Sequence, residues 1–335
     1  SRGNPCFCEN FAQGSMAPGI DVGFSSDTGG GWSEYYQVPR SNVVKVPEDF
    51  TDEQVVMLEP LCSSLQPVLR MRPRDSDRVL VFGCGVIGLG VIASIRALGI
   101  KCQITGVEPV PLNQEKALEK GADEIIDPTS ESIYERTVEI TGARLYRPAL
   151  EKPFCMGGFD TIYDCVGSTD TINQSFRVAA GEARFALIGI TIPRRLDWCP
   201  VWMKGITIYG CHAEGAAEYG GKQVNTFDAA IDLVSEGKVD LTDLITHRFT
   251  LDEYREAIEV NMHKAAHGAI KTIFDLRNGV KPEILQNATK GQVRNSAPSC
   301  RRWSNASCAP GLPTVPDVFF EGSNYSVSTS DSDIE

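Results

Sequence analysis

Residues 79–90, VLVFGCGVIGLG, decide the fold of this chain. Four apolar residues come first, and three glycines then follow in the spacing G-x-G-x-x-G, at Gly83, Gly85 and Gly88. The pattern predicts a buried strand, a tight glycine turn and the start of a helix. Gly83 permits the turn, Gly85 lets the backbone approach a pyrophosphate, and Gly88 allows the helix to pack closely on the strand.

The first turn of this predicted helix offers backbone N–H groups to an anion. We therefore count Val86 and Ile87 with the three glycines as candidate cofactor-binding residues. A glycine motif of this kind is weak evidence on its own, because such turns also occur for packing alone. The sequence around it strengthens the interpretation.

A second apolar strand, at 103–107, ends in Glu108, which lies 20 residues beyond Gly88. An acid at this place can accept hydrogen bonds from the hydroxyls of an adenosine ribose and would repel a 2′-phosphate. The sequence therefore predicts a dinucleotide cofactor, with NAD favoured over NADP. The alternative is a solvated glutamate at a strand end beside a turn that serves packing only.

Two later apolar strands also end in glycine, in YDCVGS (163–168) and ALIGI (186–190). Ligands of open α/β sheets bind at the carboxyl ends of the strands. Val166, Gly167, Ile188 and Gly189 are therefore further cofactor-binding candidates, although each glycine could equally well only begin a loop.

Apolar strands and helices alternate from residue 78 onwards, which predicts an α/β fold with a doubly wound, parallel, six-stranded Rossmann sheet. The expected strands are 79–82, 103–107, 124–126, 159–164, 184–188 and 206–210, and the expected helices between them are 86–98, 113–120, 130–141 and 170–178. The stretch 144–158, RLYRPALEKPFCMGG, interrupts this alternation and is expected to be an exposed insertion.

The flanking regions have a different character. Residues 32–38 have strand character, and Thr51 with Gln54 predicts a capped helix start, in a helix that Pro60 should kink or divide. After the sixth strand we expect a helix at 226–235, a strand at 244–249, a helix at 251–260 and a strand at 269–274. Residues 277–335 lose all periodicity and are expected to form a disordered tail.

Composition limits the classes of function. The formal charge is −12, which argues against nucleic acid and anionic membranes as partners. No apolar stretch reaches the ~20 residues of a membrane-spanning helix. The chain has eleven cysteines, several of them within apolar runs, which suits a reducing, cytoplasmic compartment better than a disulfide framework.

The order of motifs resembles that of the zinc-type medium-chain dehydrogenases/reductases, of the alcohol, polyol and threonine dehydrogenase kind. The resemblance covers roughly residues 4–275, and its motifs appear in one consistent order. They are GGGWSEYYQVPRSNVVKVP (29–47), DEQVVMLEPL (52–61), the glycine motif, FDTIYDCVGS (159–168), RFALIGI (184–190), HRFTLDEYREAIE (247–259) and IKTIFD (270–275).

The resemblance implies a partial, mostly β GroES-like catalytic domain beside the Rossmann domain. Residues 1–75 would be the second half of that domain, residues 76–240 the NAD-binding domain, and residues 241–276 the return to the catalytic domain. It also implies NAD(P)-dependent oxidation of an alcohol or polyol to a carbonyl, with a zinc ion acting on the substrate oxygen. Family members commonly form homo-oligomers, and 202–210, WMKGITIYG, would suit an edge between subunits.

The same resemblance assigns metal roles to two residues. Glu59, in LEPL, matches the family's glutamate at the catalytic zinc, although it could be a partly exposed helix residue. Cys8, in SRGNPCFCENF (1–11), matches the last cysteine of a structural zinc lobe, with Cys6 a weaker neighbour. The other expected ligands, a cysteine and a Gly-His-Glu segment, are expected upstream of Ser1. Cys62, one helical turn from Glu59, is expected to be a packing thiol.

Two further interpretations stay open at this point. The chain could be a catalytically inactive, dinucleotide-binding fragment of such an enzyme, or a zinc-free reductase of the same superfamily. Glu59 and the cysteines near the start argue against the zinc-free reductase. The remaining histidines, at 212, 247, 263 and 267, have no metal-ligand spacing and are not expected to replace the missing ligands.

Overall fold

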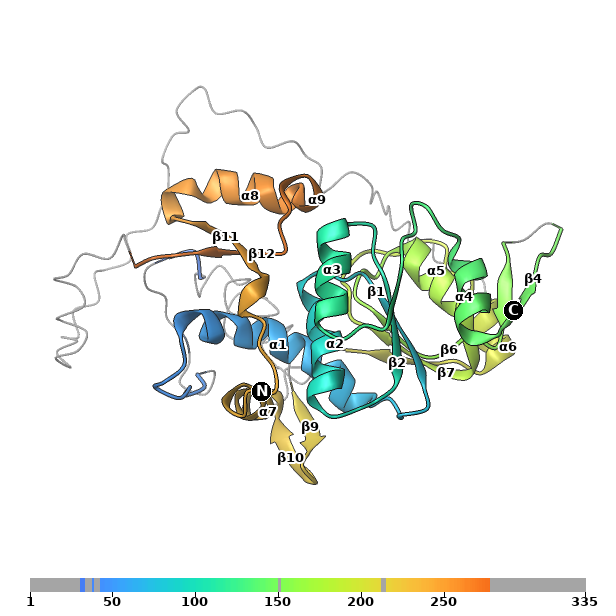
Figure 1. Cartoon of the computed structure of the whole chain (residues 1–335), viewed down its shortest axis with the longest axis horizontal. Helices are drawn as coiled ribbons and strands as arrows, with labels where there is room; N and C mark the ends of the chain where they lie inside the picture. The colour runs from blue at the N-terminus through green and yellow to red at the C-terminus, as the bar shows by residue number, and fades with distance from the viewer. Residues whose placement is uncertain (1–30, 34–37, 39–42, 150–151, 212–214, 278–335) are drawn as a thin grey trace, which may run out of the picture. The chain divides into compact units, whose positions relative to one another are not determined.

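The computed structural model describes residues 31–33, 38, 43–149, 152–211 and 215–277. Six parallel strands form its main sheet in the order β3-β2-β1-β6-β7-β8, of which β1, β2, β6 and β7 are labelled in Figure 1. These strands are β1 (Arg78–Phe82), β2 (Gln103–Val107), β3 (Glu124–Ile126), β6 (Phe159–Asp164), β7 (Ala179–Leu187) and β8 (Thr207–Gly210). The predicted doubly wound sheet is confirmed, and its chain order reverses between β1 and β6.

Helices connect the strands and produce two separate cores. They are α2 (Val86–Ala97), α3 (Pro111–Glu119), α4 (Ile133–Thr141), α5 (Thr169–Val178) and the short α6 (Cys199–Lys204). Val79 and Val81 belong to the core that contains α2, whereas Leu80 and Phe82 belong to the core that contains α5. Alternate residues of β1 therefore fill opposite faces of the sheet, as strand geometry requires, and a continuous apolar run is buried on both sides.

Helix α1 (Asp52–Arg70) begins where the sequence predicts, with a capping box between Thr51 and Gln54. Pro60 does not divide it, so that part of the prediction is wrong. A proline removes one backbone hydrogen bond, but Pro60 lies on the buried face of α1, where packing contributes most of a helix's stability. A Cβ on Gly90 of α2 would lie 2.3 Å from Ser64 Oγ, so this glycine allows α1 and α2 to pack closely.

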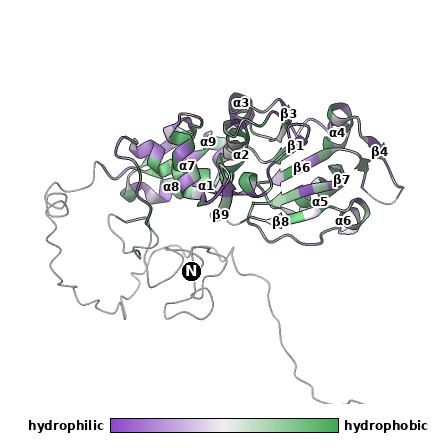
Figure 2. Cartoon of the chain, turned by 90° about the horizontal axis from the view of Figure 1, so that it is seen from below, coloured by the Kyte–Doolittle hydropathy of each residue, from purple (hydrophilic) through white to green (hydrophobic). Residues whose placement is uncertain are grey.

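The chain beyond the sheet forms smaller units. They are the hairpin of β9 (Ala216–Tyr219) and β10 (Lys222–Asn225), helix α7 (Thr226–Ser235), the 3-10 turns η4 (Thr242–Leu244) and η5 (Leu251–Glu253), the parallel pair β11 (Ile245–Phe249) and β12 (Lys271–Phe274), and helices α8 (Tyr254–Met262) and α9 (Lys264–His267). Trp32 packs edge-on against Phe274, with ring centroids 5.0 Å apart. In Figure 2 most helices carry both polar and apolar residues, as expected of helices with one buried face.

The insertion at 144–158 is an antiparallel hairpin of β4 (Arg144–Tyr146) and β5 (Phe154–Met156). The rings of Tyr146 and Phe154 stack at 5.3 Å across it. Arg177, a largely buried residue of α5, donates to the carbonyl of Lys152 at 2.7 Å and so fixes the hairpin to the domain.

Several predictions fall on residues outside the described ranges. They include most of the strand at 32–38, Cys6, Cys8, His212 and the tail from 278 onwards. Among the described residues, no helix is long and apolar enough to cross a membrane.

Candidate functional site

The glycine loop after β1 has the geometry that its sequence predicts. Gly83 has a φ of +78°, and its N–H donates to the carbonyl of Val107 at 2.9 Å. A Cβ on Gly88 would lie 1.9 Å from the carbonyl oxygen of Gly83, which no other residue could tolerate without moving the backbone. Only glycine therefore lets the first turn of α2 approach the end of the strand this closely.

The protein leaves space for a ligand at the amino end of α2. Gly85 is its N-cap residue, and no side chain of the described residues caps the helix there. A Cβ added to Gly85 would meet no atom within 4 Å. The first N–H groups of α2, at Val86, Ile87 and Gly88, therefore lack the side-chain acceptor that usually occupies this position. This arrangement suits an anion such as a pyrophosphate.

Glu108 is buried rather than solvated, with 4% of its surface exposed. One carboxylate oxygen accepts from the N–H of Cys84 at 2.7 Å, and the other accepts from the N–H of Val110 at 2.9 Å. The acid therefore ties the glycine loop to the end of β2. Each carboxylate oxygen has two lone pairs, so acceptor capacity is left for a ribose hydroxyl. Burial, and then the negative charge of Glu108, raise the pKa of the Cys84 thiol, which stays protonated.

The ends of β6 and β7 meet backbone to backbone. Gly167 has a φ of +71°, and a Cβ there would lie 2.3 Å from the carbonyl oxygen of Gly189. A Cβ on Gly189 would lie 2.2 Å from the carbonyl carbon of Val166. The side chain of Val166 lies over Gly83, where an added Cβ would be 2.5 Å from Val166 Cγ2. The structure thus brings three of the predicted loops together at the carboxyl edge of the sheet.

Asp164 belongs to this edge, although the sequence analysis did not single it out. It is the last residue of β6 and is fully buried, and its Oδ1 accepts from the N–H groups of Val166 and Gly167 at 2.9 and 2.8 Å. Burial raises the pKa of this carboxyl, against the opposing effect of those two amides and of Thr171. An acid directly before C-V-G at the end of an apolar strand was the available signal in the sequence.

Glu59 lies on the exposed side of α1 and accepts from the hydroxyl of Ser63 at 2.9 Å. Cys62 is fully buried within the core, which agrees with its predicted role as a packing thiol. Across the described part of the chain, no three His, Cys, Asp or Glu side chains converge as metal ligands. His247 stacks on Phe249 and His263 faces Glu259, so neither stands beside Glu59 in such a set.

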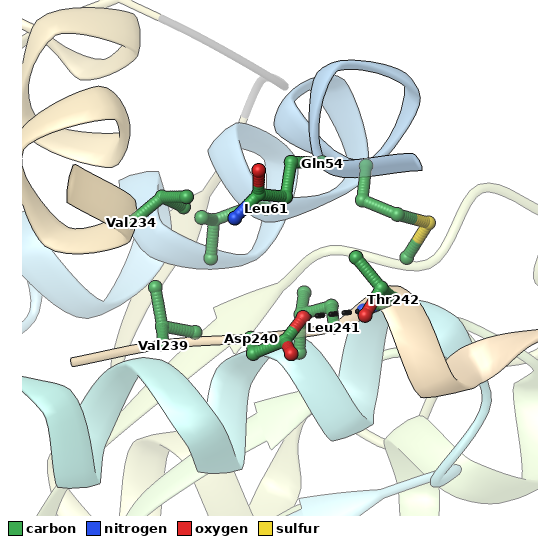
Figure 3. Close-up of a pocket in the computed structure, with 8 residues that line it drawn as sticks. Gln54, Leu61, Val234, Val239, Asp240, Leu241 and Thr242 are labelled. Carbon is green, nitrogen blue, oxygen red and sulfur yellow. Dashed lines mark hydrogen bonds between the residues drawn. The ribbon is translucent and has the colours of Figure 1, made fainter. Parts of the chain in front are cut away.

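A small pocket lies between α1 and the segment that follows α7 (Figure 3). Its lining residues are Gln54, Met57, Leu61, Val234, Val239, Asp240, Leu241 and Thr242. Asp240 turns back to accept from the N–H of Thr242 at 2.8 Å. None of the cofactor candidates lines this pocket, so it is separate from the site at the edge of the sheet.

Comparison with known proteins identifies residues 86–236 with the family described as zinc-binding dehydrogenase. The chain is 28% identical over 240 residues to L-threonine 3-dehydrogenase of Pyrococcus horikoshii, which covers 71% of this chain and 63% of that protein. It is 28% identical over 262 residues to (R,R)-butanediol dehydrogenase of Bacillus subtilis, covering 75% and 67%. The chain thus spans less than two thirds of the length of the threonine dehydrogenase.

Two solved structures show the same fold. One is an alcohol dehydrogenase of Escherichia coli CFT073 complexed with NADH, with a TM-score of 0.55 and 25% identity over 67% of this chain and 60% of that one. The other is a zinc-binding dehydrogenase of Sinorhizobium meliloti bound to NADP, with a TM-score of 0.57 and 23% identity over 73% and 66%.

Proposed function

The chain belongs to the zinc-type medium-chain dehydrogenase/reductase superfamily, and on this premise we propose that it binds NAD and serves the oxidation of an alcohol or polyol to a carbonyl, or the reverse reduction. The observation that carries the proposal is the glycine loop, where a Cβ on Gly88 would lie 1.9 Å from the Gly83 carbonyl and no side chain caps α2. A bound nicotinamide would supply the hydride acceptor. The protein's part is to hold the pyrophosphate at α2 and the nicotinamide half at the ends of β6 and β7.

The preference for NAD over NADP rests on Glu108. Its carboxylate lies at the end of β2 beside the glycine loop, where an adenosine ribose would be held. A negative charge there attracts ribose hydroxyls as acceptor and repels a 2′-phosphate. Burial strengthens both effects, because water screens the charge poorly.

Zinc chemistry is part of what the resemblance implies, but the described residues do not make a zinc site by themselves. A catalytic zinc needs three protein ligands, and within the described ranges Glu59 stands without two others. No step of the proposed reaction is therefore assigned to zinc here. Residues 1–75 and 241–276 as parts of a GroES-like catalytic domain, and 76–240 as the NAD domain, remain part of the proposal.

We further propose that the chain acts as a homo-oligomer in a reducing, cytoplasmic compartment, on small alcohol or carbonyl substrates. The seven cysteines within the described residues carry no disulfide, and four of them are buried, which supports a reducing compartment. Strand β8 has a neighbour on one side only among the described strands, which supports association through that edge.

The test is binding followed by turnover. The purified chain is titrated with NADH and with NADPH, and binding is monitored by nicotinamide fluorescence. The Kd for NADH should be lower than the Kd for NADPH by about tenfold or more. The variant Gly88→Ala should lose binding, whereas Gly181→Ala, with open space around the added methyl group, should bind as the wild type does. Equal or tighter binding of NADPH would contradict the role of Glu108.

Turnover then separates the two candidate functions. NADH formation from threonine or 2,3-butanediol, measured together with the zinc content of the protein, would establish the dehydrogenase. NADH binding without turnover on a broad panel of alcohols and polyols would establish the alternative, a dinucleotide-binding chain without catalysis. A chain that binds neither cofactor would overturn both.

A further inference from the structure

We propose that Asp164 is the positioning residue of the cofactor edge: it sets the geometry of the β6 and β7 loops that receive the nicotinamide half of the cofactor. The inference rests on the proposed dinucleotide binding and adds a residue that the glycine motif does not reveal.

The carboxylate of Asp164 shapes the loop that follows its own strand. Its Oδ1 accepts two N–H groups, from Val166 at 2.9 Å and from Gly167 at 2.8 Å. One acceptor atom therefore closes the turn after β6 and holds Gly167 in its left-handed conformation. The N–H of Cys165, which lies between Asp164 and Val166, donates instead to the carbonyl of Phe82 at 2.9 Å, so the loop is also fixed to β1.

The backbone of the same residue holds the neighbouring loop. The carbonyl oxygen of Asp164 accepts from the N–H groups of Ile188 at 3.0 Å and of Gly189 at 2.9 Å. The hydroxyl of Thr191, two residues further on, donates to the carbonyl of Gly167 and closes the contact from the other side. Asp164 is therefore bonded to four amides, two in each loop, and all four belong to residues predicted to bind the cofactor.

Asp164 also bears on the glycine loop after β1, through the packing of Val166. Val166, which donates to Asp164, lies so close to Gly83 that a Cβ there would be 2.5 Å from Val166 Cγ2. A shift of the β6 loop would therefore press on the glycine loop or leave a gap beside it. The side chain of Asp164 therefore holds the β6 loop directly and bears on the glycine loop through Val166, while its backbone carbonyl holds the β7 loop.

Burying an aspartate side chain at this position costs free energy of folding. Asp164 is fully buried, and its Oδ2 makes no hydrogen bond to any other residue in the described part of the chain. Burial opposes ionisation and raises the pKa of the carboxyl. An apolar residue would avoid this cost but could not accept the two amides, so the cost points to a requirement of the site rather than of the core.

The experiment compares Asp164→Ala and Asp164→Asn in the full chain, with NADH as the probe. Asp164→Ala removes the acceptor and should raise the Kd for NADH about tenfold or more. Asp164→Asn keeps an amide oxygen at Oδ1 and should stay within about threefold of the wild type. Thr161→Val is the matched control: Thr161 lies three residues before Asp164 in the same strand and is hydrogen-bonded to Asp77, so its loss should lower stability without changing the Kd.

Amide exchange provides a measurement that needs no variant to fold. In the wild-type chain without cofactor, the amides of Val166 and Gly167 should exchange slowly, because they are bonded to a buried carboxylate. Fast exchange at both would overturn the proposal, as would Asp164→Ala binding NADH with unchanged affinity. If the wild type fails to bind NADH, the proposed function falls and this inference falls with it. If it binds and only the variant results fail, the proposed function stands alone.

Discussion

At the scale of single residues, the space of one methyl group decides what the glycine loop accepts. Gly83, Gly88, Gly167 and Gly189 each lie within 2.5 Å of a neighbour at the point where a Cβ would be placed. Gly85 has open space instead and faces the region where a pyrophosphate would lie. The first four keep protein close to protein, and the open space at Gly85 would let the backbone approach the proposed pyrophosphate.

Glu182 shows the opposite situation, a side chain where glycine would fit better. It lies within β7 with a φ of +57°, and it is exposed. A residue with a Cβ pays about 1–2 kcal/mol in this left-handed region. Glycine avoids this cost in the folded chain, although it also makes the unfolded chain more flexible, which offsets part of the gain.

We therefore expect Glu182→Gly to raise the free energy of unfolding by about 0.5–1 kcal/mol in urea denaturation. Glu182→Ala is the matched control, because it removes the same carboxylate but keeps the Cβ, and it should bring no such gain. A less stable glycine variant would show that the backbone strain at this position is absent.

At the scale of elements, a network of ion pairs joins the end of β12 to β11 and to the start of α1. Arg277 pairs with Asp275 and lies 3.7 Å from Asp52, while Arg248 of β11 lies 3.1 Å from Glu53 and 3.8 Å from Asp275. These elements are about 200 residues apart in the chain. The network therefore fastens the returning segment to the helix that precedes the Rossmann domain.

This network should make stability depend on pH in the acid range. The hydrogen bonds from Arg277 lower the pKa of Asp275 from 3.8 to about 2. A carboxyl whose pKa is lower in the folded state stabilises the fold above its unfolded pKa, and that contribution disappears as the pH falls through the folded value. The contribution of Asp275 should therefore be complete above about pH 4 and be lost between pH 4 and 2.

Urea midpoints measured between pH 6 and 2 provide the check. Asp275→Asn should be less stable than the wild type at pH 6, and the difference should shrink towards pH 2. Added salt should also reduce it, because these groups lie near the surface. Glu236→Gln, which breaks only the local pair with Lys238, should show no such convergence. A difference between Asp275→Asn and the wild type that is constant over pH would count against the network.

At the scale of the whole molecule, the edge of the main sheet at β8 bears on assembly, because no further strand among the described residues pairs with it there. Helix α6, which precedes β8 in the chain, and the residue before it expose Trp198, Trp202 and Met203, with Trp202 84% exposed. Ile208, on β8 itself, is 37% exposed. An apolar edge strand attracts other strands unless it is covered, and a second copy of this chain could pair its own β8 there about a two-fold axis.

Sedimentation velocity of the full chain should therefore show a dimer or a larger closed assembly. Trp202→Glu should shift it towards monomer, weakening association about tenfold or more. Met262→Glu is the control, since Met262 is 71% exposed on α8 and should leave the assembly intact. A monomeric wild type, or an unchanged assembly in Trp202→Glu, would contradict association through β8.

Much of the secondary structure could be predicted from local sequence patterns. The glycine loop, the capping box at Thr51 and Gln54 and five of the six sheet strands were predicted within one residue, because apolar period, turn glycines and caps act over short distances. The sixth, β7, was predicted but begins five residues earlier than expected, at Ala179. The hairpins β4–β5 and β9–β10 and helix α6 were not predicted. Their strands and helix are only three to six residues long and are held by contacts from elsewhere in the chain, such as that of Arg177 with Lys152.

The sequence by itself determined the doubly wound fold and predicted the glycines and the acid of the proposed cofactor site, since these follow from period and spacing. Only the tertiary structure decided that Glu108 is buried against the glycine loop, that α1 continues through Pro60, and that Asp164 joins two loops. The reason is physical: Glu108 bonds to an amide 24 residues away, at Cys84, and Asp164 to one 24 residues away, at Ile188, while the burial of Pro60 depends on packing against other elements. No local pattern encodes such contacts.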